Sequence, residues 1–193
     1  MDGNPSRPPQ PLCPTRFLLR VRSLTALKEN YNVIVELLHE IGQSSEKASP
    51  KAAGLRHQLL RSETYFCVLI CIELFQVVEN LSTAIQKPSA SLSGILESVE
   101  SVVTSLKARA EDASAFEAIW SEVKIQIDAE NLYPPEQPRR RSVPKRYDLP
   151  DPVNFSSAKE KLKKVYQDIF TKAAEEINKR FSQDGIKIYM KLE

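Results

Sequence analysis

The sequence has few of the residues that build metal, cofactor and disulfide sites. Its 193 residues include five glycines, three cysteines and two histidines. Five glycines are too few for a glycine-rich phosphate-binding architecture. The cysteines (Cys13, Cys67, Cys71) and histidines (His39, His57) are too sparse for a disulfide framework or a C2H2 zinc site. The motifs GxSxG, HExxH, GxxxxGK[ST] and GxGxxG do not occur. We therefore expect no catalytic residues, no metal and no cofactor.

The chain also lacks an excess charge of either sign. Lysine and arginine total 27 against 25 aspartates and glutamates, a net charge of +2 that indicates no partner by itself. Apolar residues make up 41% and charged residues 27%, which is the composition of a folded rather than a wholly disordered chain. The first 14 residues contain no apolar stretch of the kind found in a signal peptide, so secretion is not expected.

Proline is nearly absent from most of the chain and concentrated in two segments. Five of the 13 prolines lie within residues 5–14 and six within residues 134–152, and between Thr15 and Tyr133 only Pro50 and Pro88 occur. Helices cannot run through proline-rich segments. We therefore predict a disordered leader (1–14), a helical body (15–130), a basic proline-rich linker (131–156) and a C-terminal helix with a tail (157–193).

Apolar residues recur at three- and four-residue steps between the prolines, which predicts an all-α fold. One helix is expected over residues 24–41, and another starts at Ser49-Pro50. Stripes from 92 to 106, from 114 to 123 and from 157 to 181 predict three more. Ser114 with Glu117, and Ser157 with Glu160, have the spacing of capping boxes. The expected architecture is an elongated bundle of about five or six helices.

Residues 65–78 are apolar on nearly every side, which is typical of the central helix of a bundle. Fourteen residues are shorter than the roughly 20 needed to cross a bilayer, and Glu73 and Gln76 interrupt the run, so we expect no membrane segment. Cys67 and Cys71 share one helix face but have no third ligand nearby, which predicts buried core thiols rather than a metal site. We expect residues 65–79 to be the most buried element.

A basic segment follows Pro138, with five cations in eight positions. They are Arg139, Arg140, Arg141, Lys145 and Arg146. Such a segment can neutralise phosphates without a defined fold and has the composition of a nuclear-import signal. It can equally be a linker whose charge keeps it soluble, and both interpretations stay open.

A second, smaller basic patch precedes the body. Arg16 and Arg20 are spaced to share one helix face. Together they could contact a phosphate, or their aliphatic stems could cover the edge of the bundle while the guanidinium groups reach water.

The order of several segments resembles the hAT-type transposases and their domesticated relatives, such as zinc finger MYM-type proteins. The resemblance begins with Thr15-Arg16-Phe17, where the family has Thr-Arg-Trp, and continues through 20–27 and 29–31. It includes Ala53-Gly54-Leu55, the apolar segment 65–78 with Asn80-Leu81-Ser82 behind it, Trp120 before Ile125, the basic segment 139–146, and Tyr166, Ile169 and Arg180-Phe181-Ser182.

The resemblance implies a part of such a protein rather than its catalytic core. In these transposases three metal-binding carboxylates lie on an RNase H-like core, and a long helical insertion separates the second aspartate from the final glutamate. The matched residues correspond to the start and middle of that insertion. None of them can be assigned to the triad, which implies a truncated fragment or a domesticated remnant. A fragment should also leave apolar surface uncovered, especially along Ile169, Ala173 and Ile177.

Two functional classes follow from these observations. The first is a non-catalytic, transposase-derived nuclear module that associates with DNA through its basic linker, without sequence preference. The second is a helical scaffold that binds protein partners, such as other segments of a full-length transposase-like protein, and no nucleic acid; its compartment would be nuclear or cytoplasmic. The near-zero net charge favours the second class, and the local basic segment favours the first.

Overall fold

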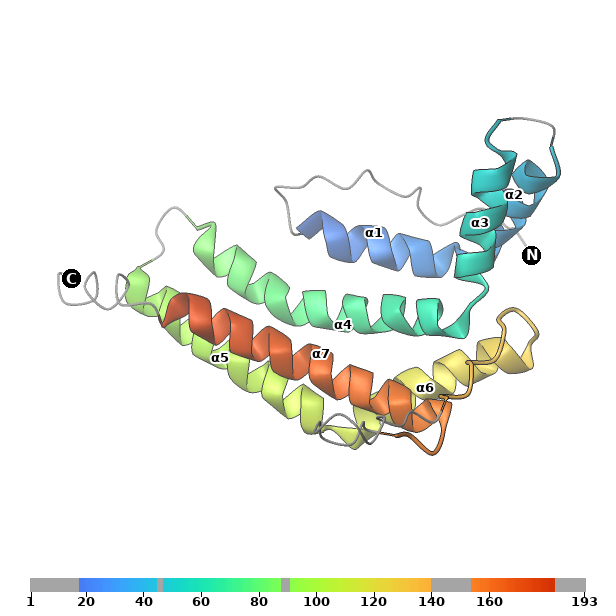
Figure 1. Cartoon of the computed structure of the whole chain (residues 1–193). Helices are drawn as coiled ribbons and strands as arrows, with labels where there is room; N and C mark the ends of the chain where they lie inside the picture. The colour runs from blue at the N-terminus through green and yellow to red at the C-terminus, as the bar shows by residue number, and fades with distance from the viewer. Residues whose placement is uncertain (1–17, 45–46, 88–90, 140–153, 183–193) are drawn as a thin grey trace, which may run out of the picture.

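The computed structural model describes residues 18–44, 47–87, 91–139 and 154–182. Helices account for 82% of this part of the chain, which confirms the all-α prediction (Figure 1). Its strand-like contact is a single isolated bridge between Arg61 and Tyr133. The helices are α1 (Leu18–Glu29), α2 (Tyr31–Gln43), α3 (Ser49–Leu59), α4 (Ser62–Ile85), α5 (Leu92–Glu111), α6 (Ala113–Asp128) and α7 (Ala158–Phe181).

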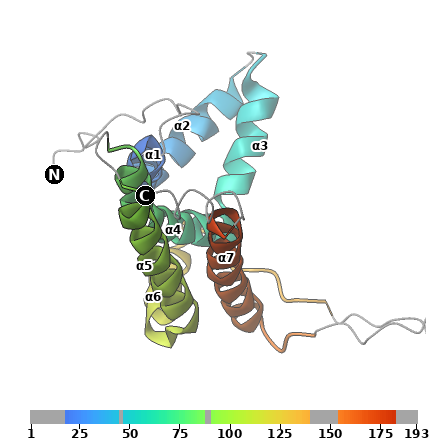
Figure 2. The same cartoon turned by 90° about the vertical axis from the view of Figure 1, so that its left-hand side faces the viewer.

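Helix α4 is the central element of an elongated bundle. It packs against α1, α5 and α6 and touches α3 and α7, while α5 and α7 lie along each other. The hairpin of α2 and α3 projects from one end of the bundle (Figures 1 and 2). The predicted central position of residues 65–79 is therefore confirmed. The helix itself is longer than the apolar run, because Glu79 to Ile85 continue it.

The described residues contain seven helices rather than five or six, because the helix predicted over 24–41 is broken at Asn30. Asn30 has φ −106° and ψ 17°, outside the α-helical range. Its buried side-chain amide donates a 2.8 Å hydrogen bond to the carbonyl oxygen of Ala26. Asparagine competes with helix propagation by bonding to nearby backbone groups in this way. The apolar periodicity continues across the break, so the sequence pattern did not reveal it.

One of the two predicted capping boxes is wrong and the other is close to the prediction. The N-cap of α6 is Asp112, not Ser114, and its Oδ1 accepts hydrogen bonds from the backbone of Ser114 at 2.8 Å and of Ala115 at 3.1 Å. At α7, Ser157 Oγ accepts the backbone N–H of Glu160 at 3.2 Å. The Glu160 carboxylate accepts in return from the backbone of Ser156 at 2.6 Å. The negative charge of Asp112 also interacts favourably with the positive N-terminal end of the α6 dipole, which the neutral hydroxyl of Ser114 cannot do.

A row of four aromatic rings forms the centre of the core. The ring of Phe66 in α4 meets that of Phe116 in α6 at 6.2 Å between centroids, Phe116 meets Tyr166 in α7 at 5.8 Å, and Tyr166 meets Phe170 at 4.8 Å. All four are at most 1% exposed. Edge-to-face contacts of this kind add to the free energy gained from burial alone. The row fixes α6 and α7 against α4.

Helix α7 is covered more completely than a helix at the cut edge of a fragment should be. Ile169, Ala173 and Ile177, which were expected to be uncovered, are partly buried and pack against the core. The beginning of the predicted linker is attached as well. The backbone N–H of Tyr133 donates to the carbonyl of Leu60 at 2.8 Å, and Leu132 is 4% exposed.

Removing the first ring of the row should destabilise the protein strongly. We expect Phe66→Ala to lower the free energy of unfolding by about 3–5 kcal/mol, because the substitution loses burial and leaves a cavity among three helices. Urea denaturation followed by circular dichroism measures the change. Ile125→Ala is the matched control, since Ile125 is 64% exposed. An equal loss in the free energy of unfolding for the two variants would contradict the proposed core.

Candidate functional site

The predicted basic site lies largely outside the described residues. Arg139 is exposed at the end of a described segment, whereas Arg140, Arg141, Lys145, Arg146 and Arg16 are outside those residues. Arg20 is half-buried on α1 and has an interaction partner there. The described structure therefore brings no two of these arginines and lysines together. Beyond the linker, the first turns of α7 carry the exposed lysines Lys161, Lys163 and Lys164.

The predicted burial of the two cysteines is wrong. Cys67 is exposed and Cys71 is partly exposed. They lie on a face of α4 away from Phe66 and Ile70, which are fully buried. Partial burial raises the pKa of both thiols, so both are protonated at neutral pH. The sequence could not show which face is covered, because the run is apolar all round. Within the described ranges no group of three or more His, Cys, Asp or Glu residues could hold a metal.

A polar cluster that the sequence analysis did not identify lies where α4, α5 and α7 meet. Arg109 Nε is 3.1 Å from Glu73 Oε2, and Arg109 Nη1 is 3.9 Å from Asp112 Oδ2. Glu73 Oε2 and the hydroxyl of Tyr166 are buried and have no aligned hydrogen-bond partner in the described part of the chain. The Arg109–Glu73 contact is thus an ion pair without a well-directed hydrogen bond. The one sequence signal was Glu73 itself, an acid within an apolar run.

Burial controls the protonation of this cluster. Desolvation raises the pKa of Glu73, and the nearby charge of Arg109 offsets this only in part. Burial also raises the pKa of Tyr166 to about 12, with the charge of Glu73 adding to the shift. Perturbed carboxyl groups often mark active sites, but structural ion pairs produce the same shifts. The cavity beside Tyr166 is about 60 Å³, far below the several hundred Å³ of a ligand pocket. The cluster is therefore structural.

A second polar contact joins α1, α4 and α6. Lys28 Nζ lies 2.8 Å from Glu122 Oε1, and the hydroxyl of Tyr65 donates to the same oxygen at 2.9 Å. The ring of Tyr65 meets Tyr31 of α2 at 4.8 Å, and the Tyr31 hydroxyl donates to the carbonyl of Leu59 at 2.6 Å. This chain of contacts connects the projecting hairpin to the bundle.

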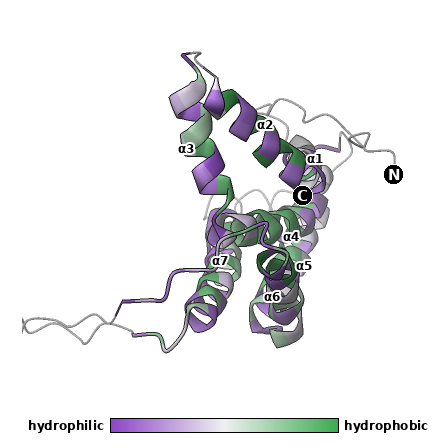
Figure 3. Ribbon diagram, turned by 90° about the vertical axis from the view of Figure 1, so that its right-hand side faces the viewer, coloured by the Kyte–Doolittle hydropathy of each residue, from purple (hydrophilic) through white to green (hydrophobic). Residues whose placement is uncertain are grey.

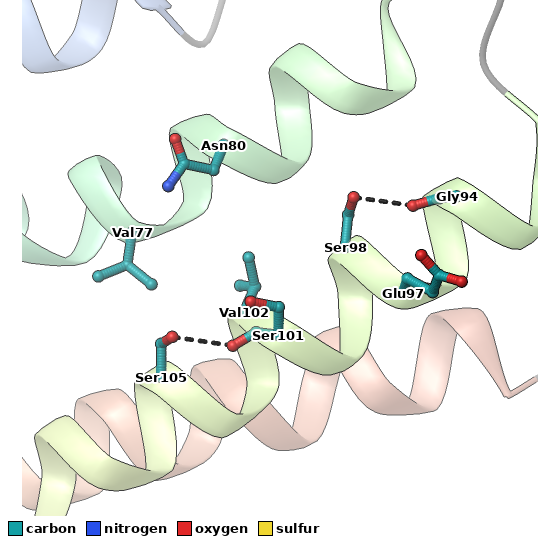
Figure 4. Close-up of a pocket in the computed structure, with 8 residues that line it drawn as sticks. All are labelled: Val77, Asn80, Gly94, Glu97, Ser98, Ser101, Val102 and Ser105. Carbon is teal, nitrogen blue, oxygen red and sulfur yellow. Dashed lines mark hydrogen bonds between the residues drawn. The ribbon is translucent and has the colours of Figure 1, made fainter.

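An open groove of about 390 Å³ runs between α4 and α5 (Figure 4). The serine hydroxyls on α5 that line it are partly used within that helix. Ser98 donates to the carbonyl of Gly94 and Ser105 to that of Ser101, each at 2.8 Å. Glu97 is the one ionisable residue of its lining. Such a surface offers no pair of groups for acid–base or nucleophilic chemistry.

Apolar side chains reach solvent on the hairpin. Val33 and Leu37, one turn apart on α2, are 55% and 53% exposed, and Leu55 on α3 is 48% exposed. Figure 3 shows apolar residues along α2 beside polar ones. Together with Cys67 on α4, these residues are apolar surface of the described bundle.

Comparison of the chain with protein-family models, with curated proteins and with solved structures finds no match. The candidate sites are therefore interpreted from their own chemistry.

Two tyrosine-to-phenylalanine substitutions should change stability in opposite directions. Tyr65→Phe removes a hydrogen bond to a carboxylate and should lower the free energy of unfolding by about 1.5 kcal/mol. Tyr166→Phe removes a buried hydroxyl without a partner and should raise it by about 1 kcal/mol. Thermal and urea denaturation of both variants measure the sign of each change in the free energy of unfolding. A loss of stability in Tyr166→Phe would show that its hydroxyl is hydrogen-bonded in solution.

The Glu73 carboxyl should make stability depend on pH in a defined direction. Because its pKa is raised in the folded state, its favourable contribution is present below the ordinary value of 4.5 and is lost as pH rises through the folded-state pKa. The stability of Glu73→Gln should therefore improve relative to the parent chain as the pH rises above 4.5. Measuring the difference between the two proteins cancels the titration of the other carboxylates. A difference that is constant with pH would contradict the buried carboxyl.

Proposed function

We propose that this chain is a non-catalytic helical module of a hAT-type transposase-like nuclear protein, which associates with nucleic acid through phosphates and without sequence preference. The observation that carries the proposal is the density of cations in the linker, five in eight positions from Arg139 to Arg146. Local acids are few, with Glu136 before the segment and Asp148 after it.

The fold supports the transposase part of the proposal. The insertion of those transposases is helical, and the described residues form a helical bundle with long antiparallel helices. The shared order of the segments from Thr15 to Ser182 supports it in the sequence.

The described carboxylates support a role in binding rather than catalysis. Asp112 caps α6, and Asp168 pairs with Lys164 at 2.9 Å along α7. Glu73 pairs with Arg109. Two-metal phosphoryl chemistry needs carboxylates that hold two ions about 4 Å apart, and these acids already have structural partners on different surfaces.

Electrostatics explains how the linker would work. Phosphates are bound by charge wherever cations can approach them, so the linker needs no fixed conformation. Lys161 and Lys163 add two exposed cations at the start of α7, after the acids Asp148, Asp151 and Glu160. Phosphate contacts hold a protein on a duplex but carry no sequence information. We therefore expect equal affinity for unrelated duplexes.

A second candidate function is a protein-binding scaffold without nucleic-acid contacts. The observation that favours it is the exposed apolar surface of the hairpin, where Val33, Leu37 and Leu55 are each about half exposed. Large exposed apolar patches mark interaction sites in soluble proteins.

The salt dependence of duplex binding distinguishes the two candidates. If the linker contacts four or five phosphates, the logarithm of affinity should fall with the logarithm of salt concentration with a slope of about −4. Replacing the five linker cations by alanine should flatten this slope and abolish nuclear accumulation, while the circular dichroism spectrum stays unchanged. Fluorescence anisotropy with two unrelated duplexes measures the slope.

A matched control removes five charges elsewhere. It replaces exposed lysines outside the linker and outside the start of α7 by alanine, namely Lys47, Lys51, Lys107, Lys124 and Lys172. This control has the same net charge as the linker variant and should keep most of the affinity. If the linker variant binds DNA and enters the nucleus like the parent, the scaffold function is favoured instead.

A further inference from the structure

A short proline-rich segment lies between α6 and the linker cations, and we call its residues 133–139 the PxxP segment. The sequence there is Tyr-Pro-Pro-Glu-Gln-Pro-Arg, in which Pro135 and Pro138 are three residues apart. After its first residue the segment forms neither helix nor strand. Pro134 and Arg139 are exposed, and Pro135 and Pro138 are partly exposed. The segment is therefore open to a partner.

The prolines restrict the backbone of the PxxP segment strongly. Each proline holds its own φ at about −65°, and a residue that precedes a proline is held in an extended conformation. Within residues 133–138, Glu136 alone is free of both restraints. The polyproline II helix satisfies them and repeats every three residues. In this conformation Pro135 and Pro138 lie on one edge, about 9 Å apart.

The bundle anchors the first half of the segment. Leu132, the residue before it, is 4% exposed, and the backbone N–H of Tyr133 donates to the carbonyl of Leu60 at 2.8 Å, at the base of α3 (Figure 1). The backbone N–H of Glu136 donates to Glu63 Oε1 at 3.3 Å. Both hydrogen bonds use N–H groups, and no described residue donates to a carbonyl of the segment. These carbonyls remain available as acceptors.

These properties define the kind of partner that the segment fits. Domains that recognise polyproline II segments bind them in grooves lined with aromatic side chains, which pack against the prolines. A ligand that already has this conformation loses little conformational entropy on binding. The cations Arg139, Arg140 and Arg141 directly follow the prolines, so a complementary groove has acidic side chains at that end.

We propose that the PxxP segment is a binding site for a domain of the SH3 type, whose aromatic groove takes Pro135 and Pro138 and whose acidic side chains face Arg139. This contact depends on the positions of the prolines as well as on charge. It rests neither on the transposase resemblance nor on nucleic-acid binding. The segment buries less than the roughly 800 Å² per partner of a standard interface, so the Kd should be in the micromolar range.

The experiment titrates the full chain with a panel of purified SH3 domains that have acidic residues beside the aromatic groove, and follows binding by isothermal titration calorimetry. The leader repeats the PxxP spacing among Pro5, Pro8, Pro11 and Pro14. All measurements therefore use a Pro8→Ala, Pro11→Ala background, in which Pro135 and Pro138 are the one pair of prolines with this spacing. At least one domain of the panel should bind this background.

Substitutions within the segment test the contact. Pro135→Ala and Pro138→Ala should each weaken binding about tenfold or more, because each loses a contact with the groove and frees the backbone. Glu136→Gln is the matched control, since Glu136 lies on a different edge of a polyproline II helix and should leave the affinity unchanged. Circular dichroism verifies that the helical bundle is retained in all three variants.

A pair of charge reversals separates this contact from DNA binding. Arg139→Glu and Arg146→Glu change the net charge equally, so they should weaken duplex binding equally. Arg139→Glu should weaken binding of the domain about tenfold, and Arg146→Glu much less, because Arg146 is eight residues beyond Pro138. The two proline variants keep every charge and should leave the salt dependence of duplex binding unchanged.

Three results would overturn the proposal. The first is that no domain of the panel binds, and the second is that Pro135→Ala and Pro138→Ala bind like their background. The third is an equal loss of domain binding in Arg139→Glu and Arg146→Glu, which would show a contact through charge alone. A chain that binds duplex DNA but no SH3 domain would keep the proposed function and refute this inference, whereas the reverse result would do the opposite.

Discussion

The constraint on which this structure depends is the need to cover an apolar helix of 24 residues. Helices α1, α3, α5, α6 and α7 pack against α4, and Tyr31 of α2 meets it through the ring of Tyr65. The ring of Phe66 begins the aromatic row that holds α6 and α7 in place. Burial of this surface provides the main favourable free energy, because the described hydrogen bonds between helices are few and largely at the edges. The other helices are positioned by their contacts with α4.

Polar groups are placed where the helices must meet in one register. Glu73 and Arg109 join α4 and α5, while Lys28, Glu122 and Tyr65 join α1, α6 and α4. The first set is incompletely hydrogen-bonded, which costs stability, because burying a charge without full compensation is unfavourable. These polar groups instead fix how α4 is aligned with its neighbours. Without them, an apolar helix such as α4 could slide or rotate with little change in buried area.

The sequence predicted the class of fold and the approximate position of most helices, because proline placement and apolar periodicity are local properties. It failed where an individual side-chain hydrogen bond, or the covering of one helix face by its neighbours, decided the outcome. The break at Asn30 depends on the hydrogen bond from its side-chain amide to the carbonyl oxygen of Ala26. The N-cap of α6 is Asp112 and not Ser114, because the Asp112 carboxylate accepts the first backbone N–H groups of the helix. The exposure of Cys67 depends on which neighbours cover α4, and an all-round apolar run carries no signal about that. Of the proposed basic site, the described residues include Arg139 and Arg20, so it remains a prediction from sequence.

The two kinds of candidate surface lie on different parts of the chain and would bind through different interactions. The linker cations act through long-range charge, which salt weakens. The exposed hairpin residues Val33, Leu37 and Leu55 would act through apolar burial, which salt does not weaken. Ionic strength therefore separates their contributions within one protein. The functions are also compatible. A protein bound at the hairpin that also contacts the same duplex would raise the affinity of the assembly through effective concentration, without any new contact by this chain. Such avidity requires that the linker and the bound protein reach the DNA together, so it would depend on the apolar surface of the hairpin as well as on the charge of the linker.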